Sequence, residues 1–202
     1  MDGDAGTQAA RLERLETELA LLKNQLHGLG GVEGMNAALV KPAAGQEDRL
    51  SLIVFSGSLD RLIAAFVLAT GAAAMGMKVS MFFTFWGTSA LRRDAQVKKS
   101  LLERMFGWML PKGVAKLPLS QMNMGGGGPM MIRYIMKKKG VASVEEMMGI
   151  AAELGVEVNI CTMSMDLLGM KEPEMVEYPG LAYCGVAKFL ETAAPGKITM
   201  FV

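Results

Sequence analysis

The chain is poor in the side chains from which metal centres, disulfide frameworks and histidine-based catalytic sites are built. It has two cysteines, Cys161 and Cys184, and a single histidine, His27. Two cysteines cannot make the multi-bridge framework of a small secreted domain. A lone histidine with no acidic or thiol cluster beside it supports neither a catalytic triad nor a zinc site. We therefore expect no metal and no cofactor, and we expect His27 to lie on the surface.

The chain also lacks an excess of charge of either sign. Its 21 Lys and Arg residues against 20 Asp and Glu residues give a formal net charge of +1, which argues against broad electrostatic binding to nucleic acid. The first residues are polar and charged, so the sequence predicts no signal peptide, and we expect a cytoplasmic protein. An apolar stretch at 62–77 is shorter than the roughly 20 residues that a membrane-spanning helix needs. We expect a buried helix there instead, followed by a strand.

What the N-terminal part does contain is regularly spaced leucine. Residues 1–9 are small and polar, and we expect a disordered tail. Across residues 10–28 and just beyond, leucines at 12, 15, 19, 22, 26 and 29 follow the spacing of a coiled-coil heptad. Opposite charges at the flanking positions would pair across a parallel coiled coil. An amphipathic helix docked on its own domain would show the same pattern, so both interpretations stay open.

The rest of the chain has the pattern of an α/β domain. Glycine and proline make residues 29–47 a linker, and a domain at 48–202 follows. Alternating or continuous apolar runs predict strands at 50–55, 79–84, 156–160 and 198–202, with helices near 59–75, 101–110, 144–154 and 186–192. Strands that alternate with helices are typical of a parallel sheet. We therefore predict a three-layer α/β fold, with a mainly parallel sheet of four to five strands and helices on both faces.

The segment around Cys161 is the best candidate for chemistry. Residues 156–160 alternate in the manner of a strand, and Thr162 or Ser164 could cap a short helix that follows. Cys161 is therefore expected where a strand ends and a helix begins. Ligands of open α/β sheets bind outside the carboxyl ends of the strands, and a helix N-terminus favours a thiolate. The alternative is a small buried residue that merely closes the strand.

Three other side chains at the same predicted edge are weaker candidates for lining the site. Ser56 and Ser58 follow the first strand, and Trp86 follows the second. Trp86 could form a wall of the site near Cys161, and ordinary packing is an equal alternative. The glycines at 125–128 lack the Gly-Lys-Ser/Thr ending of a phosphate-binding loop, so we expect a flexible flap or a plain linker there.

Several segments together carry a resemblance to a known family. They are Leu-Ile-Val-Phe-Ser-Gly at 52–57, Phe-Thr-Phe-Trp-Gly at 83–87, a Met- and Gly-rich segment at 122–131, Cys-Thr-Met-Ser-Met-Asp at 161–166 and Ile-Thr-Met-Phe-Val at 198–202. In this order they resemble the DsrE/DsrF-like sulfurtransferase family, in the larger subgroup often labelled peroxiredoxin-like. The resemblance covers residues 48–202, and the leucine-rich helix lies outside it.

The resemblance implies a cytoplasmic sulfur-relay protein that carries sulfane sulfur as a persulfide on Cys161. It also implies rhodanese-like or TusA-like partners and a homo-oligomer. Backbone N–H groups near Met163 and Ser164 would stabilise the thiolate, and Asp166 is expected to orient the turn, since a carboxylate beside a thiolate raises its pKa. Cys184 matches no motif residue and is expected to be a small buried side chain. A thiol peroxidase usually needs an activating arginine and often a resolving thiol, and neither is evident near Cys161 in sequence.

Two other functions stay open on the sequence. The chain could be an oligomeric binding or scaffold module in which Cys161 only packs, and a solvent-inaccessible Cys161 would favour that function. The Met- and Lys-rich region at 122–139 could instead associate with a membrane surface, although membrane association is the weakest of the three.

Overall fold

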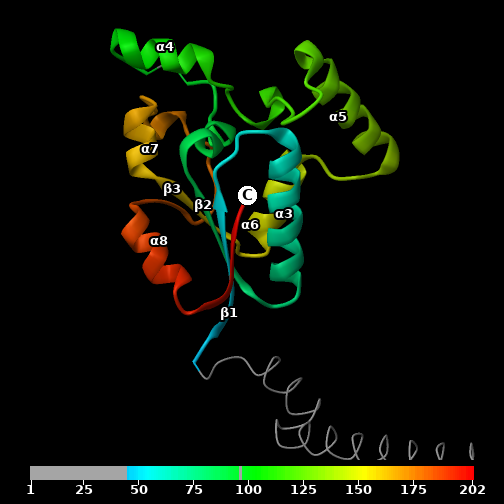
Figure 1. Ribbon diagram of the computed structural model, residues 1–202, viewed down its shortest axis with the longest axis vertical. Coiled ribbons are helices and arrows are strands. Elements are labelled where there is room, and N and C mark those ends of the chain that lie inside the picture. The colour runs from blue at the N-terminus through cyan, green and yellow to red at the C-terminus, as the bar shows by residue number, and fades with distance from the viewer. Residues whose placement is uncertain (1–44, 96) are drawn as a thin grey trace, which may run out of the picture. The chain divides into compact units, whose positions relative to one another are not determined.

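The computed structural model describes residues 45–95 and 97–202 (Figure 1). The predicted tail at 1–9, the leucine-heptad helix at 10–28 and nearly all of the predicted linker at 29–47 lie outside the described residues. The domain predicted from residue 48 has its first strand one residue earlier, at Glu47.

A five-stranded sheet in the order β4-β3-β2-β1-β5 forms the centre of the domain, and all four strand pairings are parallel. The strands are β1 (Glu47–Val54), β2 (Lys78–Phe83), β3 (Glu157–Cys161), β4 (Leu181–Cys184) and β5 (Gly196–Phe201). The chain therefore moves outward from β1 to β4 and then returns across the sheet, so that β5 pairs with the free side of β1. This arrangement confirms the predicted parallel α/β sheet.

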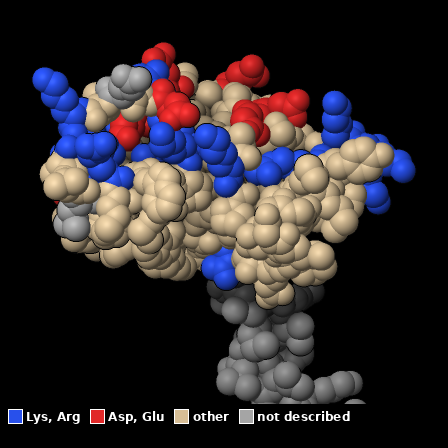
Figure 2. All heavy atoms as spheres, turned by 90° about the horizontal axis from the view of Figure 1, so that it is seen from above, with Lys and Arg blue, Asp and Glu red and all other residues tan. Residues whose placement is uncertain are grey.

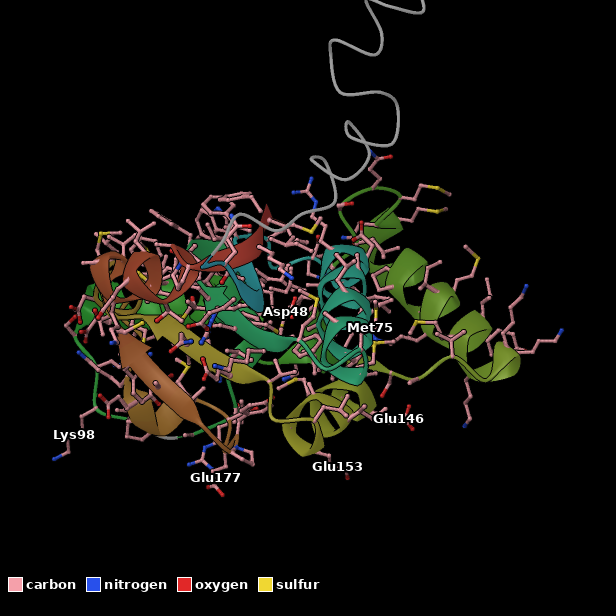
Figure 3. All side chains as sticks on the ribbon, turned by 90° about the horizontal axis from the view of Figure 1, so that it is seen from below. Asp48, Met75, Lys98, Glu146, Glu153 and Glu177 are labelled. Atoms are coloured by element: carbon pink, nitrogen blue, oxygen red, sulfur yellow. The ribbon has the colours of Figure 1, made fainter. Side chains whose placement is uncertain are left out.

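Helices connect every pair of consecutive strands. They are α3 (Leu59–Ala74), α4 (Leu101–Met109), α5 (Gly127–Lys139), α6 (Val144–Glu153), α7 (Thr162–Leu167) and α8 (Val186–Ala193), with short 3₁₀ helices η1 (Phe85–Leu91), η2 (Val114–Lys116), η3 (Met124–Gly126) and η4 (Glu172–Glu174). α6 packs beside α3 on one side of the sheet, and α8 lies on the other side (Figure 1). Figure 3 shows the domain from below and labels Asp48 in β1 and Met75 after α3.

The strand β2 shows how the two faces of the sheet are filled. Met81 and Phe83 point into the larger core, where the ring of Phe83 lies 6.3 Å from that of Phe66 in α3. Phe82 points to the opposite face and stacks on Phe189 of α8, with ring centroids 4.7 Å apart. Since successive side chains of a strand alternate between faces, β2 is buried on both sides. The predicted three layers are thereby confirmed.

Helix caps follow the sequence in part. The spacing of three residues between Ser143 and Glu146 predicts a capping box. At the start of α6, the Ser143 hydroxyl accepts from the Glu146 N–H (3.2 Å) and the Glu146 carboxylate accepts from the Ser143 N–H (2.7 Å), so this prediction is confirmed. Ser58 does occupy the N-cap of α3, but its side chain makes no capping bond. Its hydroxyl lies 2.9 Å from that of Ser56 instead. A serine directly before Leu59, with Asp60 in the first turn of the helix, predicts a side-chain cap at Ser58, and that prediction is wrong.

The glycine-rich segment at 125–128 is helical. Gly125 and Gly126 have φ values of 64° and 101°, which favour glycine because a Cβ would be strained there. They form η3 and lead into α5, which begins at Gly127, two residues before Pro129.

Among the described residues, no helix combines the length and the apolar character needed to cross a bilayer.

Candidate functional site

Cys161 is the last residue of β3 and occupies the N-cap position of α7. The predicted strand-to-helix junction is therefore present, but neither Thr162 nor Ser164 is the cap, because both lie inside the helix. α7 has only six residues. The positive end of a helix arises from its aligned peptide dipoles, so a helix this short offers the thiolate only the few N–H groups of its first turn.

The side chain of Cys161 faces α8 and is almost completely buried. It is 3% exposed and clusters with Phe82 of β2 and with Phe189 and Ala193 of α8. The sequence left open both a reactive thiol at the edge of the sheet and a small buried side chain that closes the strand, and in the free chain the side chain is buried. The physical reason is the period of two along β3, which turns Cys161 toward the face that α8 covers.

The second cysteine lies directly beside the first. In the β3–β4 pairing, Cys184 is the register partner of Cys161, and both side chains therefore point to the α8 face. Cys184 is only partly buried, and its thiol donates to the Asn159 side-chain oxygen at a sulfur–oxygen distance of 3.9 Å. Burial raises the pKa of the Cys184 thiol, and the charge of an ionised Cys161 adds to this effect.

Sequence reasoning missed this neighbour because it missed β4. The strand has four residues, Leu181–Cys184, which is too short for alternation to identify it. Without β4 there is no basis for pairing Cys184 with Cys161. The one available signal was that Cys184 precedes Gly185 at the start of a helix, as Cys161 precedes Thr162.

Ser164 has a structural contact rather than a place beside the thiol. Its hydroxyl is buried, accepts from the Phe85 N–H at 2.9 Å and lies 2.9 Å from the Thr84 hydroxyl. Phe85 has a φ of 46°, a left-handed conformation that is uncommon for a bulky residue. The Ser164 hydroxyl therefore joins α7 to the turn after β2 and helps to hold Phe85 in that conformation.

Two of the candidates in α7 are exposed to solvent, whereas the Cys161 side chain is buried. Met163 is 54% exposed, and Asp166 is also exposed. The carboxylate of Asp166 acts instead on Lys171, whose pKa is raised chiefly by its bond to Glu103 and to a smaller extent by Asp166. The predicted roles of Met163 and Asp166 at the thiol remain predictions that rest on backbone position alone.

Ser56, Ser58 and Trp86 come together with one another. The two serine hydroxyls share a hydrogen bond, and the Trp86 carbonyl accepts from the Ser89 hydroxyl at 2.7 Å. A Cβ at Gly57 would lie 2.6 Å from the Trp86 carbonyl oxygen, so the turns after β1 and β2 touch. The two turns thus meet at the carboxyl edge through the serine hydroxyls and the Trp86 main chain, while the Cys161 side chain faces α8.

A cleft of about 1020 Å³ lies elsewhere, against α4. Its charged lining residues are cationic apart from Glu174 and include Arg92, Lys98, Lys99 and Arg104, and the lining also contains the exposed side chain of Trp108. The buried carboxylate of Glu174 pairs with Arg92 (3.2 Å) and Lys99 (2.5 Å). Figure 2 shows Lys and Arg side chains gathered across this end of the molecule. Neither cysteine lines the cleft, and no pattern in the sequence predicts it.

The structure also bears on metal binding. Within residues 45–95 and 97–202, no group of three or more His, Cys, Asp and Glu side chains is arranged to hold a metal ion.

The chain is similar in sequence to one family model and to two known proteins. A family model described as DsrE/DsrF/DrsH-like matches residues 46–201. The chain is 43% identical over 159 residues to the uncharacterised protein YrkE of Bacillus subtilis, covering 78% of this chain and 98% of that protein. It is 34% identical over 161 residues to the sulfur carrier protein DsrE2 of Allochromatium vinosum, covering 78% and 99%. The crystal structure of the ychN protein from E. coli is similar at a TM-score of 0.43 and 10% identity, covering 76% of this chain and 99% of that one.

Proposed function

Because the chain belongs to the DsrE/DsrF/DrsH-like family, we propose that it is a sulfur-relay protein that carries sulfane sulfur as a persulfide on Cys161. The observation that carries the proposal is the 34% identity to a sulfur carrier protein over nearly the whole of that protein. The position of Cys161 at the carboxyl end of a central strand supports it, because ligands of such sheets bind at that end.

The proposed chemistry is thiol–persulfide exchange. The Cys161 thiolate attacks the outer sulfur of a donor persulfide, a new S–S bond forms on Cys161, and the donor leaves as a thiolate. Discharge is the same step in reverse, because an acceptor thiolate attacks the outer sulfur of the Cys161 persulfide and Cys161 leaves as the thiolate. Neither step needs an external oxidant, reductant or metal.

Access to the thiol is the main requirement of this function. Phe189 and Ala193 of α8 cover Cys161 in the free chain, so α8 must move, or sulfur must reach Cys161 through a neighbouring group. α8 is short and most of its residues are exposed. Local opening of this helix therefore costs less free energy than opening the larger core.

The partners follow from the same family. We propose rhodanese-like or TusA-like sulfur carriers as donors and acceptors, and a homo-oligomer as the working form. The edge strand β5 supports self-association, because Ile198, Met200 and Phe201 are 40% or more exposed and its outer backbone edge has no partner strand within the described residues.

A loading experiment tests the proposal. Full-length protein and Cys161→Ser are incubated with inorganic polysulfide, free thiols are blocked, and peptides are analysed by mass spectrometry. We expect one added sulfur to be retained on Cys161 in the wild type and no stable loading of the 161–166 segment in the variant. A wild-type protein whose 161–166 segment never gains a sulfur, while other thiols of the chain do, would contradict it.

The burial of Cys161 favours one other function, a binding or scaffold module without sulfur chemistry. In that case Cys161 packs against Phe82 and Phe189 only as a small apolar side chain. An alkylating reagent distinguishes the two, because a carrier thiol reacts in the folded protein over minutes to hours, whereas a packing thiol reacts only after denaturant is added.

A further inference from the structure

The two cysteines are neighbours across the β3–β4 pairing. Cys161 and Cys184 are register partners in adjacent parallel strands. Strands that share hydrogen bonds lie about 4.7–4.9 Å apart, and two cysteines can form a direct sulfur–sulfur bond when their Cα atoms are about 4.4–6.8 Å apart. The backbone therefore brings the two sulfurs within reach of one another with no movement of the strands.

Their side chains share one face but differ in exposure. Cys161 is 3% exposed beneath Phe189, while Cys184 packs at the margin of the same cluster and is partly open to solvent. Cys184 also lies one residue before Gly185, which is the N-cap of α8. A reagent that approaches from solvent therefore meets Cys184 before it meets Cys161.

The Cys184 thiol is held by a polar contact on this face. Its sulfur lies 3.9 Å from the Asn159 side-chain oxygen, and the Asn159 amide nitrogen donates to the Ser80 hydroxyl at 3.0 Å. Ser80 is fully buried, so this short chain of polar groups is anchored in the sheet. A positioned thiol beside a covered thiol is the arrangement that an internal transfer step requires.

We propose that Cys184 is a second sulfur-carrying residue, which takes sulfane sulfur from a donor persulfide or polysulfide and passes it to Cys161. The inference rests on the proposed function of Cys161. In the transfer step, the Cys161 thiolate attacks the outer sulfur of the Cys184 persulfide. The bond between the outer sulfur and Cys184 breaks, a bond to Cys161 forms, and Cys184 leaves as a thiolate that is then reprotonated. The number of S–S bonds is unchanged, so no oxidant or reductant is consumed.

This step resolves the conflict between the burial of Cys161 and its role as a carrier. Sulfur would reach Cys161 from its strand neighbour, beneath the cover of Phe189, and α8 would not have to open fully. A persulfide on the covered thiol would also be shielded from water and stray thiols, while Cys184 remains the residue that partners touch.

The test uses the full chain and inorganic polysulfide as the sulfur source. Loading of the Cys161 peptide is followed over time by mass spectrometry in the wild type, in Cys184→Ser and in Ala182→Ser. Serine at 184 keeps a donor for Asn159 but cannot carry sulfur. Ala182 is exposed, and it lies on the same strand and face as Cys184, so its variant is the matched control.

We expect Cys184→Ser to load Cys161 on the order of tenfold more slowly, because the route through the neighbouring thiol is lost, and Ala182→Ser to load at the wild-type rate. In Cys161→Ser, we expect the added sulfur to accumulate on Cys184, which a purely structural Cys184 would not show. Equal loading rates in Cys184→Ser and the wild type, with no sulfur on Cys184 in Cys161→Ser, would overturn the relay and leave the proposed function of Cys161 intact. A wild type that never loads Cys161 would overturn both.

Discussion

Gly87, in the turn after β2, has no room for a side chain. A Cβ built there would lie 2.3 Å from the Val54 carbonyl oxygen, because the turn after β2 crosses the end of β1. Real Cβ atoms do not approach backbone so closely, and the neighbour is main chain that cannot move aside. The close crossing of these two turns therefore depends on a glycine at this position.

We predict that Gly87→Ala lowers the free energy of unfolding by about 3 kcal/mol or more, since overpacking a buried backbone contact forces the main chain to shift. Urea unfolding followed by circular dichroism measures the loss. Gly149 in α6 is the matched control, because it is exposed, helical and has no atom within 4 Å of a built Cβ. Gly149→Ala should raise stability by about 0.5–1 kcal/mol. Similar changes in the free energy of unfolding for the two substitutions would contradict the conclusion that Gly87 has no room for a side chain.

At the scale of the element, α8 acts as the cover of Cys161. Phe189 of this helix is 2% exposed and stacks on Phe82, whereas Leu190, the next residue, is 57% exposed. The helix thus has one side that seals the thiol and one that does not. This division allows the cover to be removed without removing the helix.

Phe189→Ala should increase the rate at which an alkylating reagent modifies Cys161, because the ring that shields the sulfur is gone. The substitution should also cost about 3–5 kcal/mol of stability, as for other buried aromatic residues. Leu190→Ala, in the same helix, should change neither quantity appreciably. The labelling rate is measured by mass spectrometry well below the unfolding transition. An unchanged rate in Phe189→Ala would mean that another group limits access to the thiol.

The elements also show how far the sequence predicts this structure. Four strands and the capping box at Ser143 follow from local pattern, since alternation and capping depend on neighbours in sequence. The contact between Cys161 and Cys184 depends on which strand pairs with β3 and in which register, and local pattern does not encode that. The same holds for the cover of Cys161, because a strand shows the period of its side chains but not which of its faces a later helix will occupy.

At the scale of the whole molecule, the predicted heptad at 10–28 lies outside the described residues, and its role remains a prediction. If the leucines form a coiled coil between chains, Leu15→Glu combined with Leu22→Glu should reduce the oligomer, because both replace core d positions with charge. Light scattering coupled to size-exclusion chromatography measures the mass. An unchanged oligomer would favour a helix docked on its own domain, or association through another surface such as β5.

The order of the strands has a consequence for biosynthesis. β1 is the first strand of the domain to emerge from the ribosome, but β5, which closes its outer side, is the last. A nascent chain therefore carries an open strand edge at residues 47–54 throughout most of its translation, and pairings between such distant segments form slowly. Until residues 196–201 arrive, the growing polypeptide exposes that edge to pairing with any other extended chain, which is the kind of exposure that leads to misassembly.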